Sequence, residues 1–534
     1  MRDRKFAEPE LVRSELVIAL SSAIGTDTSR VIEEIKKQLK DFSYEANEIK
    51  ISRMVLEPLL TTEQKQTPAM RANTMMDLGN ELRTQSQDGA ILASAAISEI
   101  ARFRRGKSKD ISDPQQLQKT AFIISNLKHP NEVARLRETY GNIFFLVAVN
   151  EKKETRLDHL NRQKNLGHDD AVKLVDRDEG ESDRLGQHTR DVFELADIHL
   201  SLNNPGAQSD NDYLKAQISR MLDLMFGNPF ITPTFDEYAM FIAYASSLRS
   251  ADLGRQVGAA IANRFDEIIA TGANDVPRFG GGQYWPNAIT FKDDSNGRDY
   301  MRSYFDEKTQ TEVQGYDANK QEHIRIIEEI INMFKDDTTP TEARWKEEFR
   351  NKLLGSSIKY LTEYTRAVHA EMAAILACSR SGISLQDGTL YCSTFPCHNC
   401  AKHIVHAGLR RVVYIEPYPK SKTLKLYDDS VTITGEKEKV LFEEFVGIGP
   451  RRFFDFFSLQ LGSGRCIMRK WEDEGGPVDG SASRWDRGKA RLRFQAMALT
   501  YIEKETVETA KWESNLHASH NKEFEEEQSN EHPN

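Results

Sequence analysis

Long hydrophobic runs are missing from this sequence, which excludes a protein built around membrane-spanning helices. A bilayer span needs about 20 consecutive apolar residues, whereas the longest apolar stretch near the start is Leu16 to Leu20 and does not have a signal-peptide pattern. The chain is 39% hydrophobic and 9% aromatic, which is enough to build a folded core. We therefore expect a cytoplasmic protein.

Cysteine is also scarce, because the 534 residues contain only five. This number excludes a scaffold built from disulfides. We interpret Cys378, Cys392 and Cys466 as small buried hydrophobic residues, the usual state of a free cysteine. The remaining two, Cys397 and Cys400, form a C-x-x-C pair, a spacing typical of metal or redox sites.

An excess of positive charge is absent as well. The net charge is −10 and the isoelectric point is about 5.8. General nucleic-acid binding depends on Lys and Arg that neutralise phosphates, so this balance argues against a stable nucleic-acid substrate. A small anionic ligand held in a local basic pocket remains compatible with it.

The length favours two domains, and we expect both to be of the α/β class. The first, residues 1–225, has buried-strand patterns at 16–20, 49–52, 121–125 and 143–149, with helical patterns such as 31–39 between them. This alternation predicts a parallel sheet covered by helices. The highly charged segment 151–190 is interpreted as a solvated helical face or a mobile flap.

The second domain is expected over residues 226–515, with a long insertion at about 275–368, and a disordered tail over 516–534. Its core pattern predicts helices and strands in the order helix 238–248, strands 258–261 and 268–272, helix 369–380, strand 389–393, helix 398–407 and strand 412–415. The insertion contains a helical pattern from about 320 to 334.

Two short motifs in this domain point to metal chemistry. His369 and Glu371 open one predicted helix, and Cys397 and Cys400 open the next one after a strand. One histidine and two thiolates supply three zinc ligands and leave the fourth position for water. Glu371 is two residues from His369, so it can face that water as a proton carrier. H-x-E followed by P-C-x-x-C is the pattern of zinc-dependent nucleobase deaminases.

Two other interpretations of the C-x-x-C pair remain open at this point. A structural zinc site would need a fourth protein ligand, for which His398, His403 and His406 are nearby candidates. A thioredoxin-like redox pair would leave His369 and Glu371 without a role.

Residues 236–457 resemble the deoxycytidylate deaminase family within the cytidine deaminase-like superfamily, which implies a three-layer α/β/α fold. The resemblance lies in the stretches 255–259 (RQVGA), 271–277 (TGANDVP), 369–371 (HAE), 395–402 (FPCHNCAK) and 412–415 (VVYI). It implies that His369, Cys397 and Cys400 bind Zn²⁺ and that Glu371 transfers the proton. It also implies a substrate-binding role for Asn274, Arg255 and Pro396, with Asn274 on the sugar or base edge.

The first domain has a strand, a turn of small residues and a helix where a P-loop would lie. The pattern G-x-x-x-x-G-K-[ST] is absent, because Gly25, Thr26, Asp27, Thr28 and Ser29 include no lysine. We therefore expect a degenerate P-loop kinase-like domain that senses a nucleotide or is purely structural, with these five residues as its candidate nucleotide-binding loop.

Most of the chain resembles the two-domain bacterial deaminases that defend against phage. This resemblance includes the stretches 127–133 (LKHPNEV) and 136–141 (LRETYG). It implies deamination of dCTP or dCMP to the uracil nucleotide and a homo-oligomer that can be a hexamer. What restrains the enzyme stays open among an inhibitory RNA or protein and feedback by a pyrimidine nucleotide. The alternatives are a polynucleotide-editing deaminase, for which Tyr284 and Trp285 could stack bases, and a nucleotide-sensing regulatory protein.

Overall fold

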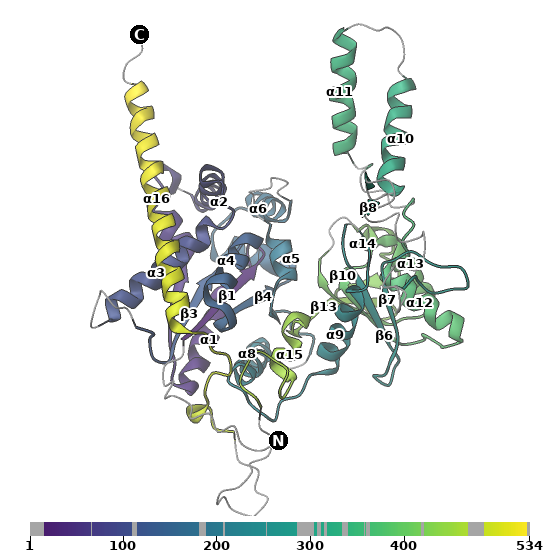
Figure 1. Ribbon diagram of the computed structural model, residues 1–534, viewed down its shortest axis with the longest axis horizontal. Helices are drawn as coiled ribbons and strands as arrows, with labels where there is room; N and C mark the ends of the chain where they lie inside the picture. The colour runs from purple at the N-terminus through teal and green to yellow at the C-terminus, as the bar shows by residue number, and fades with distance from the viewer. Residues whose placement is uncertain are drawn as a thin grey trace, which may run out of the picture. The chain divides into compact units, whose positions relative to one another are not determined.

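A computed structural model describes residues 15–65, 67–108, 115–180, 188–206, 209–252, 254–285, 304–306, 311–313, 318–333, 340–356, 358, 364–417, 421–467 and 485–530 (Figure 1). The chain divides into two compact units. Unit 1 comprises Met1–Glu237 together with Val446–Asn534, and unit 2 comprises Tyr238–Phe445. The second boundary therefore lies near residue 446, and the expectation that the deaminase-like domain continues to 515 is corrected.

Unit 1 contains a six-stranded sheet in the order β14-β5-β4-β1-β3-β2. Its strands are β1 (Glu15–Ser22), β2 (Glu45–Lys50), β3 (Thr120–Ser125), β4 (Phe144–Asn150), β5 (Ile198–Ser201) and β14 (Gly447–Ile448). Strands β1 to β5 are parallel, and β14 pairs antiparallel with β5. Strand β1 is buried along its whole length, as expected for an apolar run at the centre of a parallel sheet. The predicted parallel α/β architecture is confirmed.

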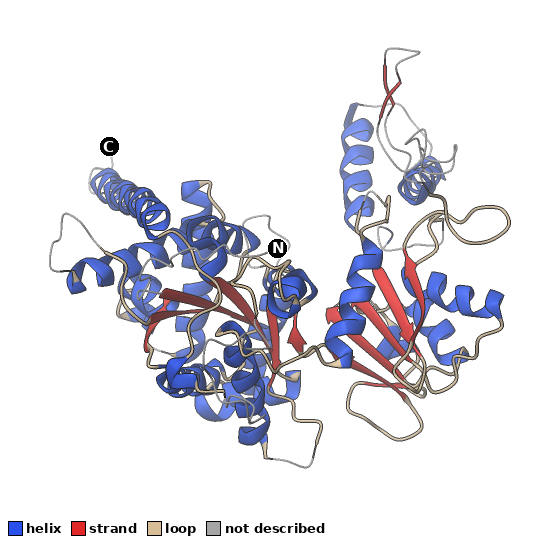
Figure 2. Ribbon diagram, turned by 60° about the horizontal axis from the view of Figure 1, so that its bottom comes forward, coloured by secondary structure: helices blue, strands red, loops and turns tan. Residues whose placement is uncertain are grey.

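Helices cover both faces of this sheet (Figure 2). The helices of unit 1 are α1 (Thr28–Leu39), α2 (Pro68–Ser86), α3 (Ile91–Lys107), α4 (Pro130–Tyr140), α5 (Lys153–Gln163), α6 (His168–Gly180), α7 (Thr189–Glu194), α8 (Asp210–Met225), α15 (Phe453–Phe457) and α16 (Ala498–Asn530). Within the described part of the chain, no helix has the length and apolar content needed to cross a bilayer.

Helix α16 belongs to unit 1 because it packs along α3 (Figure 1). Arg104 of α3 donates to Glu505 of α16 at 2.9 and 3.0 Å and also pairs with Glu15 of β1. Tyr501 of α16 donates its hydroxyl proton to the second oxygen of Glu15 at 2.7 Å. These side chains are buried, so α16 is held against α3 and β1.

The expected disordered tail also differs from the structure, since α16 continues to Asn530. The segment 516–530 contains four glutamates, at positions 523 and 525–527, and Glu has a high helix propensity. Its last residues, 531–534, lie outside the described residues.

The charged segment 151–190 forms helices α5 and α6 and only partly faces solvent. Ala171, Leu174 and Val175 of α6 are buried in a small cluster with Met76 and Leu160. The apolar residues of α6 thus recur at helical spacing among the charges and cover α2 and α5. Residues 181–187 of the proposed flap lie outside the described residues.

Unit 2 contains a second six-stranded sheet, in the order β12-β13-β11-β10-β6-β7. Strands β6 (Gly258–Ala262) and β7 (Ile268–Ala273) are antiparallel, and β10 (Thr389–Thr394) pairs antiparallel with β6. Strands β10, β11 (Arg411–Glu416), β13 (Val440–Glu444) and β12 (Val431–Thr432) are mutually parallel. Its helices are α9 (Phe235–Ser247), α12 (Ala370–Ser381), α13 (His398–His406) and α14 (Thr423–Leu426).

The predicted insertion between β7 and α12 is confirmed in its described parts. Strands β8 (Tyr304–Asp306) and β9 (Thr311–Val313) form an antiparallel pair, and helices α10 (Ala318–Met333) and α11 (Pro340–Gly355) pack against each other. The helix expected from 320 to 334 is α10.

Candidate metal centre

Two helix N-termini bring the predicted ligands together. His369 is the N-cap of α12 and Cys397 is the N-cap of α13, and both have extended backbone angles. Cys400 lies in the first turn of α13. The unpaired N–H groups and the dipole at a helix N-terminus stabilise negative charge, which favours a thiolate at Cys397. Burial acts in the opposite direction at Cys400 and raises the pKa of its thiol.

A glycine in β7 allows α12 to approach the sheet. A Cβ atom on Gly272 would lie 2.1 Å from the carbonyl oxygen of Ala370 and 2.7 Å from the amide nitrogen of Ala374. Any side chain at this position would therefore push α12 outward. The position of His369 depends on this close packing, because His369 begins the same helix.

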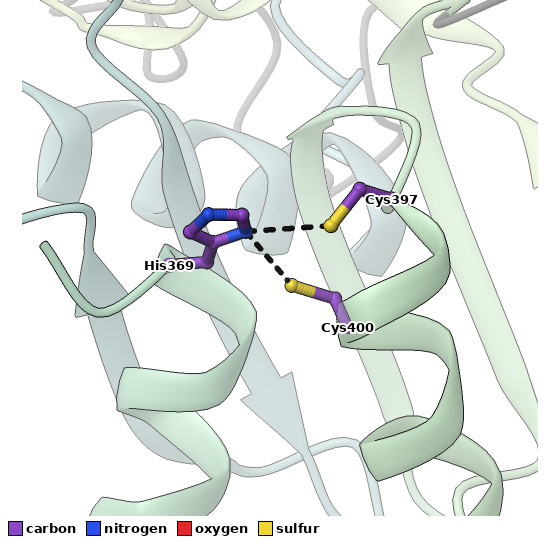
Figure 3. A group of neighbouring side chains, drawn as sticks. All are labelled: His369, Cys397 and Cys400. Carbon is purple, nitrogen blue, oxygen red and sulfur yellow. Dashed lines mark hydrogen bonds between the residues drawn. The ribbon is translucent and has the colours of Figure 1, made fainter. Parts of the chain in front are cut away.

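The three side chains converge on one point (Figure 3). The Nδ1 atom of His369 lies 3.4 Å from Sγ of Cys397 and 3.3 Å from Sγ of Cys400. The ligand atoms all lie within 4.8 Å of one another. Since zinc binds nitrogen at about 2.0–2.1 Å and sulfur at about 2.3 Å, one ion can contact all three atoms. The residues fit a zinc ion with one position left for another ligand.

The electrostatics of the group fit metal binding. The hydrogen bond from Cys400 lowers the pKa of the Cys397 thiol to about 4. The hydrogen bond to Cys397 raises the pKa of His369 to about 9. Cys397 is therefore a thiolate at neutral pH. A metal ion that binds His369 would displace the proton from its imidazole ring.

Glu371 adds a buried carboxyl group beside the ligands. Its side chain is 4% exposed, and its Oε2 atom has no hydrogen-bond partner among the described residues. Burial raises the pKa of Glu371. Leaving a buried carboxyl oxygen without a hydrogen bond is energetically costly, so this atom calls for a partner such as a water molecule, an ion or a ligand.

A fourth protein ligand is not found in the described part of the chain. The metal-binding group there consists of His369, Cys397 and Cys400 alone, without His398, His403 or His406. Cys397 and Cys400 are both free thiols. The arrangement has the open position of a catalytic zinc site rather than the closed shell of a structural one.

The side chain of Asn274, which we expect to contact substrate, forms two hydrogen bonds with the backbone. Its Oδ1 atom accepts from the amide of Val257 at 2.7 Å, and its Nδ2 atom donates to the carbonyl oxygen of Arg255 at 2.7 Å. A side-chain amide has two N–H bonds, so one remains for a further acceptor.

The two other expected substrate residues lie on neighbouring segments. The guanidinium of Arg255 is 44% exposed and contacts the buried carboxylate of Glu416 at 2.6 Å. The carbonyl oxygen of Pro396 accepts from the hydroxyls of Ser421 at 3.0 Å and Thr423 at 3.1 Å. These two bonds fix the turn that precedes Cys397.

The candidate nucleotide loop of unit 1 follows β1, and its amides are already engaged. The amide of Ile24 donates to Asp178 at 2.8 Å, and the amide of Asp27 donates to Glu151 at 3.0 Å. Asp27 also caps α1, and Thr26, Thr28 and Ser29 complete the turn into that helix. Carboxylates of the chain itself thus engage two of the backbone amides at this turn.

Helix α5 packs closely against the loop at Gly25. Gly25 has a φ of +88°, and a Cβ atom there would lie 2.8 Å from the carbonyl oxygen of Arg156 in α5. Lys128 donates to Asp178 at 2.8 Å and to the carbonyl oxygen of Ser22 at 2.9 Å. No local pattern in the sequence signals that Asp178 would reach this loop from 154 residues away.

Residues 233–416 match the profile of the cytidine and deoxycytidylate deaminase zinc-binding region. This segment contains His369, Glu371, Cys397 and Cys400. The match and the convergent His-Cys-Cys group confirm zinc as the expected cofactor.

Individual relatives agree with the profile. The deoxycytidylate deaminase of enterobacteria phage T2 is 44% identical over 55 residues, 10% of this chain and 29% of the relative. ComE operon protein 2 of Bacillus subtilis is 43% identical over 97 residues, 18% of this chain and 51% of the relative. The deoxycytidylate deaminase of Pongo abelii is 25% identical over 217 residues, 41% of this chain and 78% of the relative. The chain thus spans about half or less of the first two.

Proposed function

We propose that this protein is a zinc-dependent hydrolase that converts deoxycytidine nucleotides, dCMP or dCTP, to deoxyuridine nucleotides and releases ammonia. The observation that carries the proposal is the buried carboxyl of Glu371, whose Oε2 atom has no hydrogen-bond partner among the described residues, beside the convergent atoms of His369, Cys397 and Cys400. The family match and the names of the relatives support the substrate class.

The residues have distinct tasks in this reaction. His369, Cys397 and Cys400 would hold the zinc ion, which when bound lowers the pKa of a water molecule and so supplies a nucleophile at neutral pH. Glu371 would take one proton from the attacking water and give it to the cytosine ring nitrogen, and would then take the second proton from the newly bound hydroxyl group and give it to the leaving amine. The oxygen of water replaces the exocyclic nitrogen, which leaves as ammonia.

A free nucleotide is a better substrate for this site than a polynucleotide. A single-strand binding groove combines positive charge with stacking aromatic residues, and the net charge of the chain is −10. Arg255 is an exposed cation close to the segment held by Asn274, where it can meet the phosphate of a small ligand.

The decisive measurement is ammonia release from dCMP, dCTP, CMP, CTP and a cytosine-containing oligonucleotide, each with and without a zinc chelator. We expect chelator-sensitive turnover of the deoxynucleotides. Replacing Glu371 by Gln should lower kcat by at least about 10²-fold, the usual contribution of a general acid or base, while the zinc content stays at one ion per chain.

Replacing His403 by Gln provides the matched control, because His403 lies on α13 but outside the metal-binding group. This variant should keep both zinc and turnover. Undiminished turnover in the Glu371→Gln protein would refute the mechanism. Turnover of the oligonucleotide alone, falling steeply with salt, would establish the editing alternative instead.

We further propose a biological role in defence against phage by depletion of the deoxycytidine nucleotide pool. The support is the resemblance of the chain to two-domain bacterial deaminases, which also implies a homo-oligomer. The proposed enzyme acts in the cytoplasm, and an inhibitory RNA or protein is a candidate for restraining it. Cells that express the protein and are then infected should lose dCTP and gain deoxyuridine nucleotides. Unchanged nucleotide pools in infected cells, compared with the Glu371→Gln strain, would refute this role.

A further inference from the structure

We propose that Arg249 and Asp275 form a positioning pair that sets the place of His369 in the metal centre. The inference rests on the proposed function, because it assigns a task toward the same site. Neither residue belongs to the His-Cys-Cys group, so both would act through the backbone that carries His369.

Asp275 contacts Val368, the residue before His369, through the backbone. The amide of Val368 donates to the carbonyl oxygen of Asp275 at 3.0 Å, and the amide of Asp275 donates to the carbonyl oxygen of Val368 at 3.3 Å. This bridge is antiparallel and lies outside the main sheet. The segment that follows β7 therefore holds the chain immediately before α12.

Asp275 is fully buried, at 0% exposure, so its carboxylate needs partners inside the protein. It accepts from the amide of Val276 at 2.8 Å and lies 3.9 Å from the guanidinium of Arg249. An isolated buried carboxylate is strongly unfavourable, so the nearby cation stabilises it in this position. The bridge to Val368 is thereby anchored by a buried charge.

Arg249 is itself held in place by two hydrogen bonds and an aromatic ring. It donates to the side-chain oxygen of Gln283 at 2.5 Å and to the carbonyl oxygen of Tyr284 at 2.8 Å. Its guanidinium lies 3.9 Å from the centre of the Trp285 ring, which is a cation–π contact. A planar guanidinium with several fixed donors is far more directional than a lysine ammonium.

The pair also connects to the end of β7. Gln283 donates to the carbonyl oxygen of Ala273 at 2.5 Å, and the hydroxyl of Ser250 donates to the carbonyl oxygen of Asn274 at 2.6 Å. Residues 249–250 and 283–285 thus clamp residues 273–275 from two segments. Groups that orient a metal ligand in this way affect metal affinity and activity although they do not touch the metal.

The test uses the full-length protein with the substitutions Asp275→Asn and Arg249→Lys. Asp275→Asn keeps the shape and removes the charge, and Arg249→Lys keeps the charge and removes the fork of donors. The control is Glu443→Gln, which breaks the partly exposed Arg411–Glu443 pair in the same unit. Each protein is assayed for kcat and KM with dCMP and dCTP, for thermal unfolding, and for its visible absorption spectrum with Co²⁺ in place of zinc.

We expect both substitutions to lower kcat at least about tenfold while KM changes much less, since small displacements of a reacting group are costly. The Co²⁺ spectrum should shift in both variants and remain unchanged in the control. A Co²⁺ spectrum and kcat equal to those of the unaltered protein in a folded Arg249→Lys variant would overturn the proposal.

The two proposals fail in different ways. If the unaltered protein releases no ammonia but the Co²⁺ spectrum still shifts in the variants, the proposed function fails and the positioning pair stands. If Asp275→Asn does not fold, Arg249→Lys decides the matter, because it retains the positive charge that the buried carboxylate needs.

Discussion

Gly272 in β7 faces the carbonyl oxygen of Ala370 so closely that a Cβ atom would come within 2.1 Å of it. Ala370 is the first residue of α12 and follows His369 directly. His369 can therefore occupy its position at the start of α12 only because residue 272 in β7 has no side chain.

Replacing Gly272 by Ala should therefore damage the metal centre. The clash is with backbone atoms, which cannot rotate away, and overpacking typically costs about 1–3 kcal/mol. We expect loss of zinc and of turnover together, measured as metal content and ammonia release. Gly355→Ala is the control, because a Cβ atom there meets nothing within 4 Å. Full zinc content in the Gly272→Ala protein would contradict this reasoning.

The buried network at α16 should stabilise unit 1 strongly. Replacing Arg104 by Met leaves the carboxylates of Glu15 and Glu505 buried without their cation, and breaking such pairs costs about 3–5 kcal/mol. Arg102→Met removes an exposed pair with Glu99 on the same helix and should cost about 1 kcal/mol or less. Urea unfolding followed by circular dichroism measures both. Equal midpoints for the two variants would show that the network contributes nothing.

His199 in β5 should make unit 1 sensitive to acid. Burial lowers the pKa of His199 from 6.5 to about 4, so the unfolded chain takes up a proton that the folded chain refuses. Stability is then lost as the pH falls from about 6.5 towards 4, at roughly 1.4 kcal/mol per pH unit. His199→Gln should remove this part of the dependence. Parallel slopes of unfolding midpoint against pH between 7 and 5 in both proteins would rule the histidine out as its source.

The loop after β1 should resist nucleotide binding in the intact protein. Asp178 and Glu151 occupy the amides of Ile24 and Asp27, so a phosphate would have to displace a carboxylate from each. We expect no binding heat with ATP, dTTP or dCTP when Glu371→Gln protein is used to prevent turnover and excess free dCMP saturates unit 2. Asp178→Ala frees Lys128 and the amide of Ile24, and should bind triphosphate more tightly. Tight binding by the protein that retains Asp178 would instead support a nucleotide sensor.

Local patterns predicted the elements well where burial alone determines them. The apolar run at 16–20 became the buried strand β1, and the segment 389–393 became β10. The metal group was predictable because His369 and Cys397 are the N-caps of two helices and Cys400 lies in the first turn of the second, so the starts of these helices set where the three side chains point. The roles of Asn274, Arg255 and Pro396 toward substrate stay predictions.

Long-range contacts were not predictable in the same way. Nothing near Glu505 in the sequence indicates that it meets Arg104, which is 401 residues away, so the boundary at 446 was missed. The same holds for Asp178, whose carboxylate reaches the amide of Ile24. In both cases, the packing of segments that are far apart in the sequence decides which partner a charged residue has. From the sequence alone, the same charged residue is equally compatible with exposure to solvent.

The interruption of unit 1 by unit 2 has a consequence for the order in which a ribosome completes them. Unit 2 is one continuous stretch, Tyr238–Phe445, whereas unit 1 needs Val446 onward, including β14 and α16. At synthesis rates of about 5–20 residues per second, the metal-binding unit emerges whole while the sheet of unit 1 still lacks its edge strand and its last helix. A nascent chain from which residue 445 has left the ribosome, but β14 and α16 have not, would carry a complete metal-binding unit beside an incomplete unit 1.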